Sequence, residues 1–217
     1  PWVLHEYSLW TAMPNPKLTE KYEGKPFLLR GVPDFEKVAA ETGFTEEIPR
    51  FVRNSEKLVN LLRKEGLELA RKHPGVAGYN FWLITNFLAT CPEGIFDEFW
   101  DEQMGLTAEE FRKCNADSVI LLDDGRRRCF EQETAVTLGI DLSHFGNSEI
   151  GKPILEWDVV SNGTRISRGS ARPGVIPCGF LGNLSRPVLK FPRSDVPQEL
   201  EMKVRLYDGS GPGEKRE

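Results

Sequence analysis

The chain has 217 residues, which is enough for one large domain or two small ones. Hydrophobic residues make up 39% of it and charged residues 28%, so the composition is that of a folded globular protein and not of a disordered chain. The net charge of -5 argues against nucleic acid or an anionic membrane as the main partner, and no apolar run is long enough to span a bilayer. Because the chain begins with Pro and not Met, we expect further sequence upstream, and the lack of a visible signal peptide says little about the compartment.

The first element is a short apolar segment, residues 2–5, which predicts the end of a buried β-strand. This segment runs directly into Glu6, which Tyr7 and Trp10 follow before the turn-forming sequence MPNP. A carboxylate in this position has two interpretations. It is an ordinary polar residue at a strand end, or it lies at the mouth of a pocket and carries out chemistry.

Two helices are expected next. Asp34 is placed to cap a short helix, FEKVAAET, that Gly43 would end. A longer helix spans about residues 46–72, with Pro49 tolerated in its first turn and the sequence HPG ending it. The apolar positions of the longer helix form a roughly helical stripe: Phe51, Val52, Leu58, Val59, Leu62, Leu69 and Ala70.

The segment VAGYNFWLITNF, residues 76–87, is apolar on both faces, which is typical of a strand covered on both sides in a parallel sheet. Residues 1–85 therefore predict a βαβ crossover. A loop carrying aromatic side chains follows, and Thr107 and Glu110 then form a T-x-x-E capping box for a helix to about Ala116.

The pattern changes after Ser118, where short alternating segments with turn signals between them predict an antiparallel β-sandwich. A turn is expected at DDGR, and a hairpin turn at Asn162-Gly163. The boundary falls near 117–124, so we assign residues 1–120 to an α/β part and residues 121–217 to an all-β part. Three segments place apolar side chains on one face: Val136, Leu138, Ile140 and Leu142; Trp157 and Val159; and Leu200, Met202, Val204 and Leu206.

The metal-binding residue types give no site. The four cysteines (Cys91, Cys114, Cys129 and Cys178) form no C-x-x-C pair, and the three histidines lie far apart in the sequence. We therefore expect free thiols, no metal and no cofactor, and we leave open a disulfide between Cys129 and Cys178.

The α/β part raises a difficulty, because two parallel strands are too few for an open α/β fold. The simplest hypothesis is that they are the last strands of a closed barrel that begins upstream. Barrel active sites lie at the C-terminal ends of the strands. Glu6 follows the first strand, and Asn80, Trp82, Thr85 and Asn86 lie on or just after the second.

Several segments carry a resemblance to a known family. They are the strand end with His5 and Glu6, the strand VAGYNFWLITNF, the loop PEGIFDEFWD, and the run from SVILLDDGRRRCF to SHFGNSEIGKPILEWDVV. Together they resemble the C-terminal part of the catalytic barrel of glycoside hydrolase family 2, which includes β-galactosidases, β-glucuronidases and β-mannosidases. The resemblance implies the last strands and helices of a (β/α)8 TIM barrel in residues 1–120 and an immunoglobulin-like β-sandwich in residues 121–217.

The resemblance also implies a function, namely a retaining β-glycosidase that hydrolyses O-glycosidic bonds of carbohydrates. Glu6 matches the place of the family's nucleophile, a glutamate at the end of the seventh barrel strand. No segment of this chain fits the family's acid/base glutamate, so the upstream part of the same polypeptide would supply it. We therefore expect residues 1–217 alone to have weak or no activity. The family favours a periplasmic or extracellular location.

Residues around Glu6 are the candidates for contacts with a sugar. Rings suit such a site because apolar sugar faces stack on them, and the hydroxyl of Tyr7 or the ring of His5 could donate to a carboxylate. The candidate substrate-binding residues are His5, Tyr7, Trp10, Asn80, Trp82, Asn86 and Trp100. Several of them also have a structural interpretation: Trp82 as core, Trp100 as a loop anchor, His5 as a structural hydrogen-bonding residue and Asn86 as a turn residue. Trp157 is assigned to the core of the sandwich, and His144 receives no role.

Other functions are weighed beside this one. A non-catalytic carbohydrate-binding or interaction module built on the sandwich would need an exposed aromatic platform there. A catalytically dead barrel relative would have less reason to retain Glu6. A family 5-like endoglycanase is the nearest enzyme alternative, and a sandwich directly after the last barrel helix argues against it.

Overall fold

A computed structural model describes residues 1–26, 31–87, 91–103, 105–123 and 127–209, and the backbone of 215–216. The chain divides into two compact units, Pro1–Cys114 and Asn115–Glu217. The boundary expected at 120/121 falls inside strand β3 (Ser118–Asp123), which belongs wholly to the second unit. The units are therefore described one at a time.

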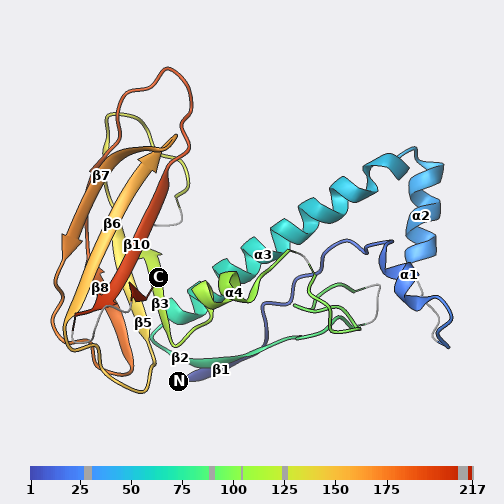
Figure 1. Cartoon of the computed structure of the whole chain (residues 1–217), viewed down its shortest axis with the longest axis horizontal. Helices are drawn as coiled ribbons and strands as arrows, with labels where there is room; N and C mark the ends of the chain where they lie inside the picture. Colours follow the sequence, from blue (N-terminus) through green and yellow to red (C-terminus); the bar gives the residue numbers. More distant parts are fainter. Residues whose placement is uncertain (27–30, 88–90, 104, 124–126, 210–214, 217) are drawn as a thin grey trace. The chain divides into compact units, whose positions relative to one another are not determined.

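The first unit mixes helices with a parallel pair of strands (Figure 1). Its elements are β1 (Trp2–Tyr7), α1 (Leu18–Tyr22), α2 (Val32–Glu41), a 3-10 turn (Thr45–Glu47), α3 (Ile48–Lys72), β2 (Val76–Phe81) and α4 (Ala108–Cys114). Strands β1 and β2 pair in parallel, with α3 on the connection between them. The predicted βαβ crossover is thus confirmed.

The local signals for the helix ends differ in how well they predicted the structure. Helix α2 begins two residues before Asp34, after Gly31 with a φ of +83°, so the expected Asp34 cap is wrong. Pro33 provides the fixed φ of the first turn instead, and Asp34 lies in that turn. The Thr107–Glu110 capping box is confirmed, because each residue accepts a hydrogen bond from the backbone N–H of the other, although α4 ends at Cys114.

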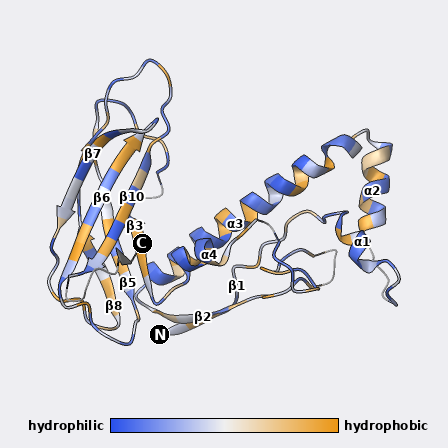
Figure 2. Cartoon of the chain, in the orientation of Figure 1, coloured by the Kyte–Doolittle hydropathy of each residue, from blue (hydrophilic) through white to orange (hydrophobic). Residues whose placement is uncertain are grey.

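The buried face of α3 differs from the expected stripe. Its buried residues are Ile48, Val52, Val59, Arg63, Leu67 and Ala70, spaced three, four or seven positions apart. Leu58 and Leu69 are exposed, although the sequence placed them in the stripe. Arg63 takes a central buried position, which a count of apolar residues alone does not predict. In Figure 2, α3 is mostly hydrophilic with spaced hydrophobic positions.

The β1–β2 sheet is less covered than expected. In the part of the chain that the structure describes, this sheet has two strands, and no residue of either strand is buried. Trp2 and Val3 are 66% and 71% exposed. Strand β2 ends at Phe81, so Trp82 and the residues after it lie in an irregular segment and not in the strand.

The second unit consists of antiparallel strands, as predicted. They are β3, β4 (Ala135–Thr137), β5 (Gly139–His144), β6 (Pro153–Ser161), β7 (Thr164–Ala171), β8 (Phe180–Ser185), β9 (Val188–Lys190), β10 (Glu201–Asp208) and β11 (Lys215–Arg216). The sheet orders are β11-β10-β6-β7, β3-β5-β8 and β4-β9. The segment expected as one strand around Val136–Leu142 is two strands, β4 and β5, which pair in different sheets on either side of Leu138.

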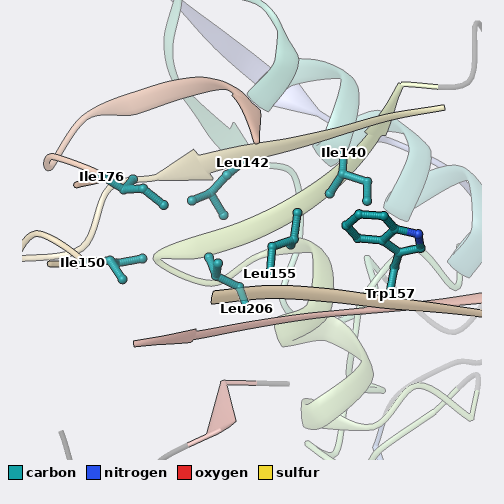
Figure 3. Close-up of a cluster of buried hydrophobic side chains, with 7 residues drawn as sticks. All are labelled: Ile140, Leu142, Ile150, Leu155, Trp157, Ile176 and Leu206. Carbon is teal, nitrogen blue, oxygen red and sulfur yellow. The ribbon is translucent and has the colours of Figure 1, made fainter. Parts of the chain in front are cut away.

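The sheets β3-β5-β8 and β11-β10-β6-β7 face each other across an apolar core (Figure 3). Ile140 and Leu142 from β5 meet Leu155 and Trp157 from β6 in one buried cluster. Trp157 is 9% exposed, which confirms its expected place in the core. Its indole lies over Gly169 of β7, where a Cβ atom would stand 2.2 Å from the indole Cζ2.

Two further sequence-based expectations concern turns and thiols of the second unit. Asn162 and Gly163 both have positive φ, at 48° and 77°, and join β6 to β7 as the expected hairpin. The DDGR turn lies largely at 124–126, outside the described residues. All four cysteines are free thiols, so the disulfide that was left open between Cys129 and Cys178 is not formed.

Among the described residues, no helix combines the length and apolar character needed to cross a membrane.

Candidate functional site

Strand β1 carries a β-bulge at its C-terminal end. Leu4 lies opposite Tyr79 and Tyr7 lies opposite Phe81, so β1 advances one residue more than β2 over this interval. The extra residue falls at His5-Glu6. Bulges bend a strand and re-aim its side chains, and they are frequent beside active sites.

Glu6 has a strained backbone at this bulge. Its φ is +51°, and that of Ser8 is +66°, both in the left-handed region that residues with a side chain seldom occupy. Such a conformation costs of order 1 kcal/mol or more, and it persists only where the surrounding structure imposes it. The Glu6 side chain is 44% exposed, and its Oε1 lies 3.7 Å from Nδ1 of His5. The bulge thus presents a carboxylate that solvent reaches, with an imidazole beside it.

Tyr7 and Asn80 occupy opposite faces of the β1–β2 sheet. The Tyr7 hydroxyl donates to the carbonyl oxygen of Gly66 at 2.9 Å, so this side chain faces α3. Burial, and secondarily the neighbouring Tyr79, raises the pKa of Tyr7. Two donors were considered for Glu6. The Tyr7 hydroxyl is bonded to α3 instead, whereas the His5 ring lies beside the Glu6 carboxylate. Asn80 is exposed, and alternation along β2 places it on the face away from α3.

Trp82 is held just beyond the end of β2. Its indole Nε1 donates to Oε2 of Glu93 at 2.9 Å, and the Thr11 hydroxyl donates to Oε1 of the same carboxylate at 2.6 Å. The backbone N–H of Ala12 also donates to the Pro92 carbonyl oxygen at 3.1 Å. The segments that follow β1 and β2 are therefore joined beyond the C-terminal ends of both strands.

Arg63 supports this junction from α3. The side chain is buried, and its guanidinium donates to the carbonyl oxygens of Glu93 and Gly94 while lying 5.9 Å from the Phe81 ring. Burial lowers the pKa of Arg63 to about 10, against the opposing effect of Glu93. A Cβ atom at Gly94 would stand 2.3 Å from the Thr85 backbone, so only glycine fits this close approach.

Asn86 holds the loop that follows Trp82. It is 7% exposed, its Oδ1 accepts from the Gly94 N–H at 3.0 Å, and its Nδ2 donates to Gln103 at 3.0 Å and to Glu98 at 3.3 Å. Both ends of the amide are used inside the loop. These contacts give Asn86 a structural role, which the sequence had set beside the substrate-binding one.

Asp97 is a second buried polar residue of the same loop. It is 1% exposed, pairs with Lys21, and accepts from the backbone N–H groups of Phe99 and Asp101. Burial alone would raise the pKa of Asp97, but the hydrogen bond from Lys21 and those from the backbone outweigh it and hold the pKa below its usual range. Among the described residues, no group of His, Cys, Asp and Glu side chains is placed to hold a metal ion.

The two remaining candidates are exposed tryptophans. Trp10 is 42% exposed and Trp100 is 67% exposed, with its ring centroid 6.1 Å from that of Phe96. Trp100 also has a positive φ of 66°. Both side chains are partly open to solvent, and Trp100 also lies against Phe96. Of the predicted residues, the strand pairing and the segments beyond it bring His5, Glu6, Asn80 and Trp82 to the same end of the sheet.

Sequence reasoning missed Glu93 and Arg63, which organise this end of the sheet, and also a cavity in the second unit. The cavity has a volume of about 1060 Å³ and an apolar floor that includes Leu138, Leu189 and Phe191. Its residues continue the second buried cluster of that unit, and none of them is a predicted site residue. The alternating pattern placed Leu138 on an apolar face but gave no signal of a cavity beside it.

No known protein family matches the sequence, and no curated protein matches it. Solved structures do match its fold. A β-D-mannosidase from Dictyoglomus thermophilum aligns over 96% of this chain and 26% of its own length, with a TM-score of 0.59 and 16% identity. An exo-chitosanase from Amycolatopsis orientalis, in complex with PNP-beta-D-glucosamine, aligns over 77% of this chain and 18% of its own, with 12% identity and a TM-score of 0.47 that is too low to establish a shared fold. The chain thus has a fold found within a glycoside hydrolase and spans about a quarter of that enzyme's length.

Proposed function

We propose that this chain is the C-terminal part of a retaining β-glycosidase and that Glu6 is its nucleophile. The observation that carries the proposal is the bulge with positive φ at Glu6, at the C-terminal end of a strand in a parallel pair. Strain of this kind gathers at functional sites, where the structure imposes it. The likeness of the fold to part of a β-D-mannosidase supports the proposal independently of Glu6.

The chemistry requires two carboxyl groups about 5–5.5 Å apart across the sugar bond. The Glu6 carboxylate attacks the anomeric carbon, and the second carboxyl group protonates the departing oxygen. Water then hydrolyses the glycosyl-enzyme ester, with the second group acting as base. We place that second group on a strand upstream of Pro1 in the same polypeptide.

The exposed apolar residues of β1 fit the same proposal. Trp2 and Val3 are more than half exposed, although the pattern of this strand is that of a buried one. Further strands of a (β/α)8 barrel would cover them, with the second unit as an immunoglobulin-like sandwich after the last barrel helix. A carbohydrate would then be the substrate, with His5, Asn80, Trp82, Trp10 and Trp100 as the residues available to contact it.

The alternative function, a binding module on the sandwich, receives less support. Such a module needs an aromatic platform, and the one large aromatic side chain exposed in the described part of the second unit is Phe145. The cavity of that unit is lined by Phe130 and Phe191, whose centroids are 5.4 Å apart, so these rings pack on each other.

Glu6→Gln in the full-length protein tests the proposal, with Glu102→Gln, an exposed carboxylate elsewhere in the first unit, as the control. We expect Glu6→Gln to reduce kcat on aryl β-glycosides by about a thousandfold or more, as loss of a nucleophile does. A 2-deoxy-2-fluoroglycoside should label the peptide that contains Glu6. Retained turnover in Glu6→Gln, or a label on another residue, would exclude Glu6 as the nucleophile.

A further inference from the structure

Glu93 lies where three separate parts of the first unit meet. Its side chain accepts hydrogen bonds from Trp82, just beyond β2, and from Thr11, in the segment that follows Glu6 and β1. Its carbonyl oxygen accepts from Arg63 of α3. One residue thus links the ends of both strands to the helix between them.

The side-chain contacts are specific in direction. Each carboxylate oxygen takes one donor, with the Trp82 indole at 2.9 Å and the Thr11 hydroxyl at 2.6 Å. Hydrogen bonds to an ionised acceptor are about twice as strong as neutral ones. The indole has a single N–H donor, so this bond fixes the rotation of the ring about its side-chain torsions.

The main chain of Glu93 is also held in place. Arg63 is 1% exposed and donates to the carbonyl oxygens of Glu93 and Gly94. Gly94 packs directly on the backbone of Thr85, and Pro92 accepts from Ala12. The carboxylate is therefore presented from a backbone with little freedom, as a group that orients another side chain must be.

We propose that Glu93 is a positioning residue for the glycosidase site. It holds the Trp82 indole at a fixed orientation and a fixed place relative to the segment after Glu6, so that the ring is ready to stack on the sugar. This inference rests on the proposed function and deepens it. If Glu93 had only a structural role, its loss would affect the folding of residues 91–103. Variants that still fold would then keep the parent affinity for substrate.

The experiment measures KM and kcat of the full-length protein on an aryl β-glycoside for Glu93→Ala, Glu93→Gln, Trp82→Phe and the double variant. Glu93→Ala removes the acceptor for both donors. Glu93→Gln is the conservative rescue, because its amide oxygen can accept from Trp82 while its NH2 group donates to the Thr11 hydroxyl. Glu102→Ala is the matched control, and thermal unfolding of each variant reports on the fold.

We expect Glu93→Ala to raise KM about tenfold with a smaller change in kcat, as loss of a charge-assisted hydrogen bond to a binding group predicts. Glu93→Gln should keep KM within about threefold of the parent value. In the Trp82→Phe background, Glu93→Ala should add little, because the two residues act as one unit. If Glu93→Ala does not fold, Glu93→Met fills the same space without a strong acceptor and takes its place.

The results separate this inference from the proposed function. If Glu6→Gln abolishes activity while folded Glu93→Ala keeps the parent KM, the positioning role is wrong and the proposed function stands. Additive effects of Trp82→Phe and Glu93→Ala on KM would also exclude the positioning role. If Glu6→Gln retains full activity, the proposed function fails, and the role of Glu93 in that site fails with it.

Discussion

Different kinds of contact stabilise the interior of each of the two units. In the second unit, buried aliphatic and aromatic side chains from several strands form two large clusters. In the first unit, the buried apolar clusters are small: Ala12 with Val59, and Ala39 with Ile48 and Val52. Most of the large apolar side chains that are exposed in the described residues belong to the first unit.

Buried polar groups take the place of an apolar core at the strand ends of the first unit. Arg63, Asn86 and Asp97 are all buried, and each makes several directed hydrogen bonds. Burying a polar group is costly unless its partners are in place, so such a network specifies one geometry. The unit that lacks a large core is therefore the one that fixes side chains around Glu6 and Trp82.

The comparison predicts that truncating a tryptophan to alanine lowers the free energy of unfolding far more in the second unit than in the first. Trp157→Ala removes a ring from the buried cluster and should destabilise the second unit by about 3–5 kcal/mol. Trp100→Ala removes an exposed ring and should cost less than about 1 kcal/mol. Hydrogen exchange measured by mass spectrometry in the full-length protein would report the loss of protection in β6 and β7.

Gly169→Ala sharpens this test at the same place. The new methyl group would meet the indole of Trp157, so exchange in β7 should also speed up. Equal protection in Trp157→Ala and the parent protein would contradict the view that this cluster holds the second unit together.

Asp97→Asn tests whether the ion pair between the buried Asp97 and Lys21 holds the loop of the first unit. The variant keeps an acceptor for the Phe99 N–H but loses the charge opposite Lys21, and we expect it to cost about 1–3 kcal/mol at pH 7. The pKa of Asp97 in the folded state lies below its ordinary value of 3.8. Its contribution is therefore present above that value and is lost as the pH falls through the folded pKa. The difference between variant and parent should shrink below pH 3.8.

Amide exchange of residues 97–101, corrected for the intrinsic rate at each pH, would measure that difference. Asp101→Asn is the matched control, because Asp101 binds the same lysine with a side chain that is 65% exposed. Its effect should be below about 1 kcal/mol. A constant difference between Asp97→Asn and the parent from pH 7 to pH 3 would show that the carboxylate charge is not what holds the loop.

The sequence predicted those features that depend on neighbouring residues. The capping box at Thr107, the end of α3 before His73, and the Asn162-Gly163 hairpin each follow from a few adjacent side chains. The parallel pairing of β1 with β2 followed from a strand–helix–strand pattern. The alternation of β6 and β10 also placed Trp157 and Leu206 in the core.

The backbone irregularities and the hydrogen-bond partners that distant segments impose on a residue could not be predicted. The positive φ at Glu6 arises from an extra residue in β1 relative to β2, about 70 positions away, and no local signal marks it. Arg63 is buried because the loop at Glu93 and Gly94 offers carbonyl oxygens to it. The predicted apolar stripe of α3 left out Arg63, because the helix sequence carries no information about these carbonyl partners.

A small effect is expected at the start of α4, where contacts are local and exposed. Thr107→Ala removes the hydroxyl that accepts from the Glu110 N–H at 3.2 Å, so one end of the capping box is lost. Such a change costs about 1 kcal/mol, which corresponds to roughly fivefold faster amide exchange in residues 108–114. Glu109→Ala is the control: Glu109 lies in the first turn of the same helix, and its ion pair with Lys113 is exposed to solvent, so its effect on exchange should be smaller. If Thr107→Ala instead increased exchange in the loop at 91–103 as well, the cap would support the site at β2, and the network around Arg63 and Asp97 would not hold that loop alone.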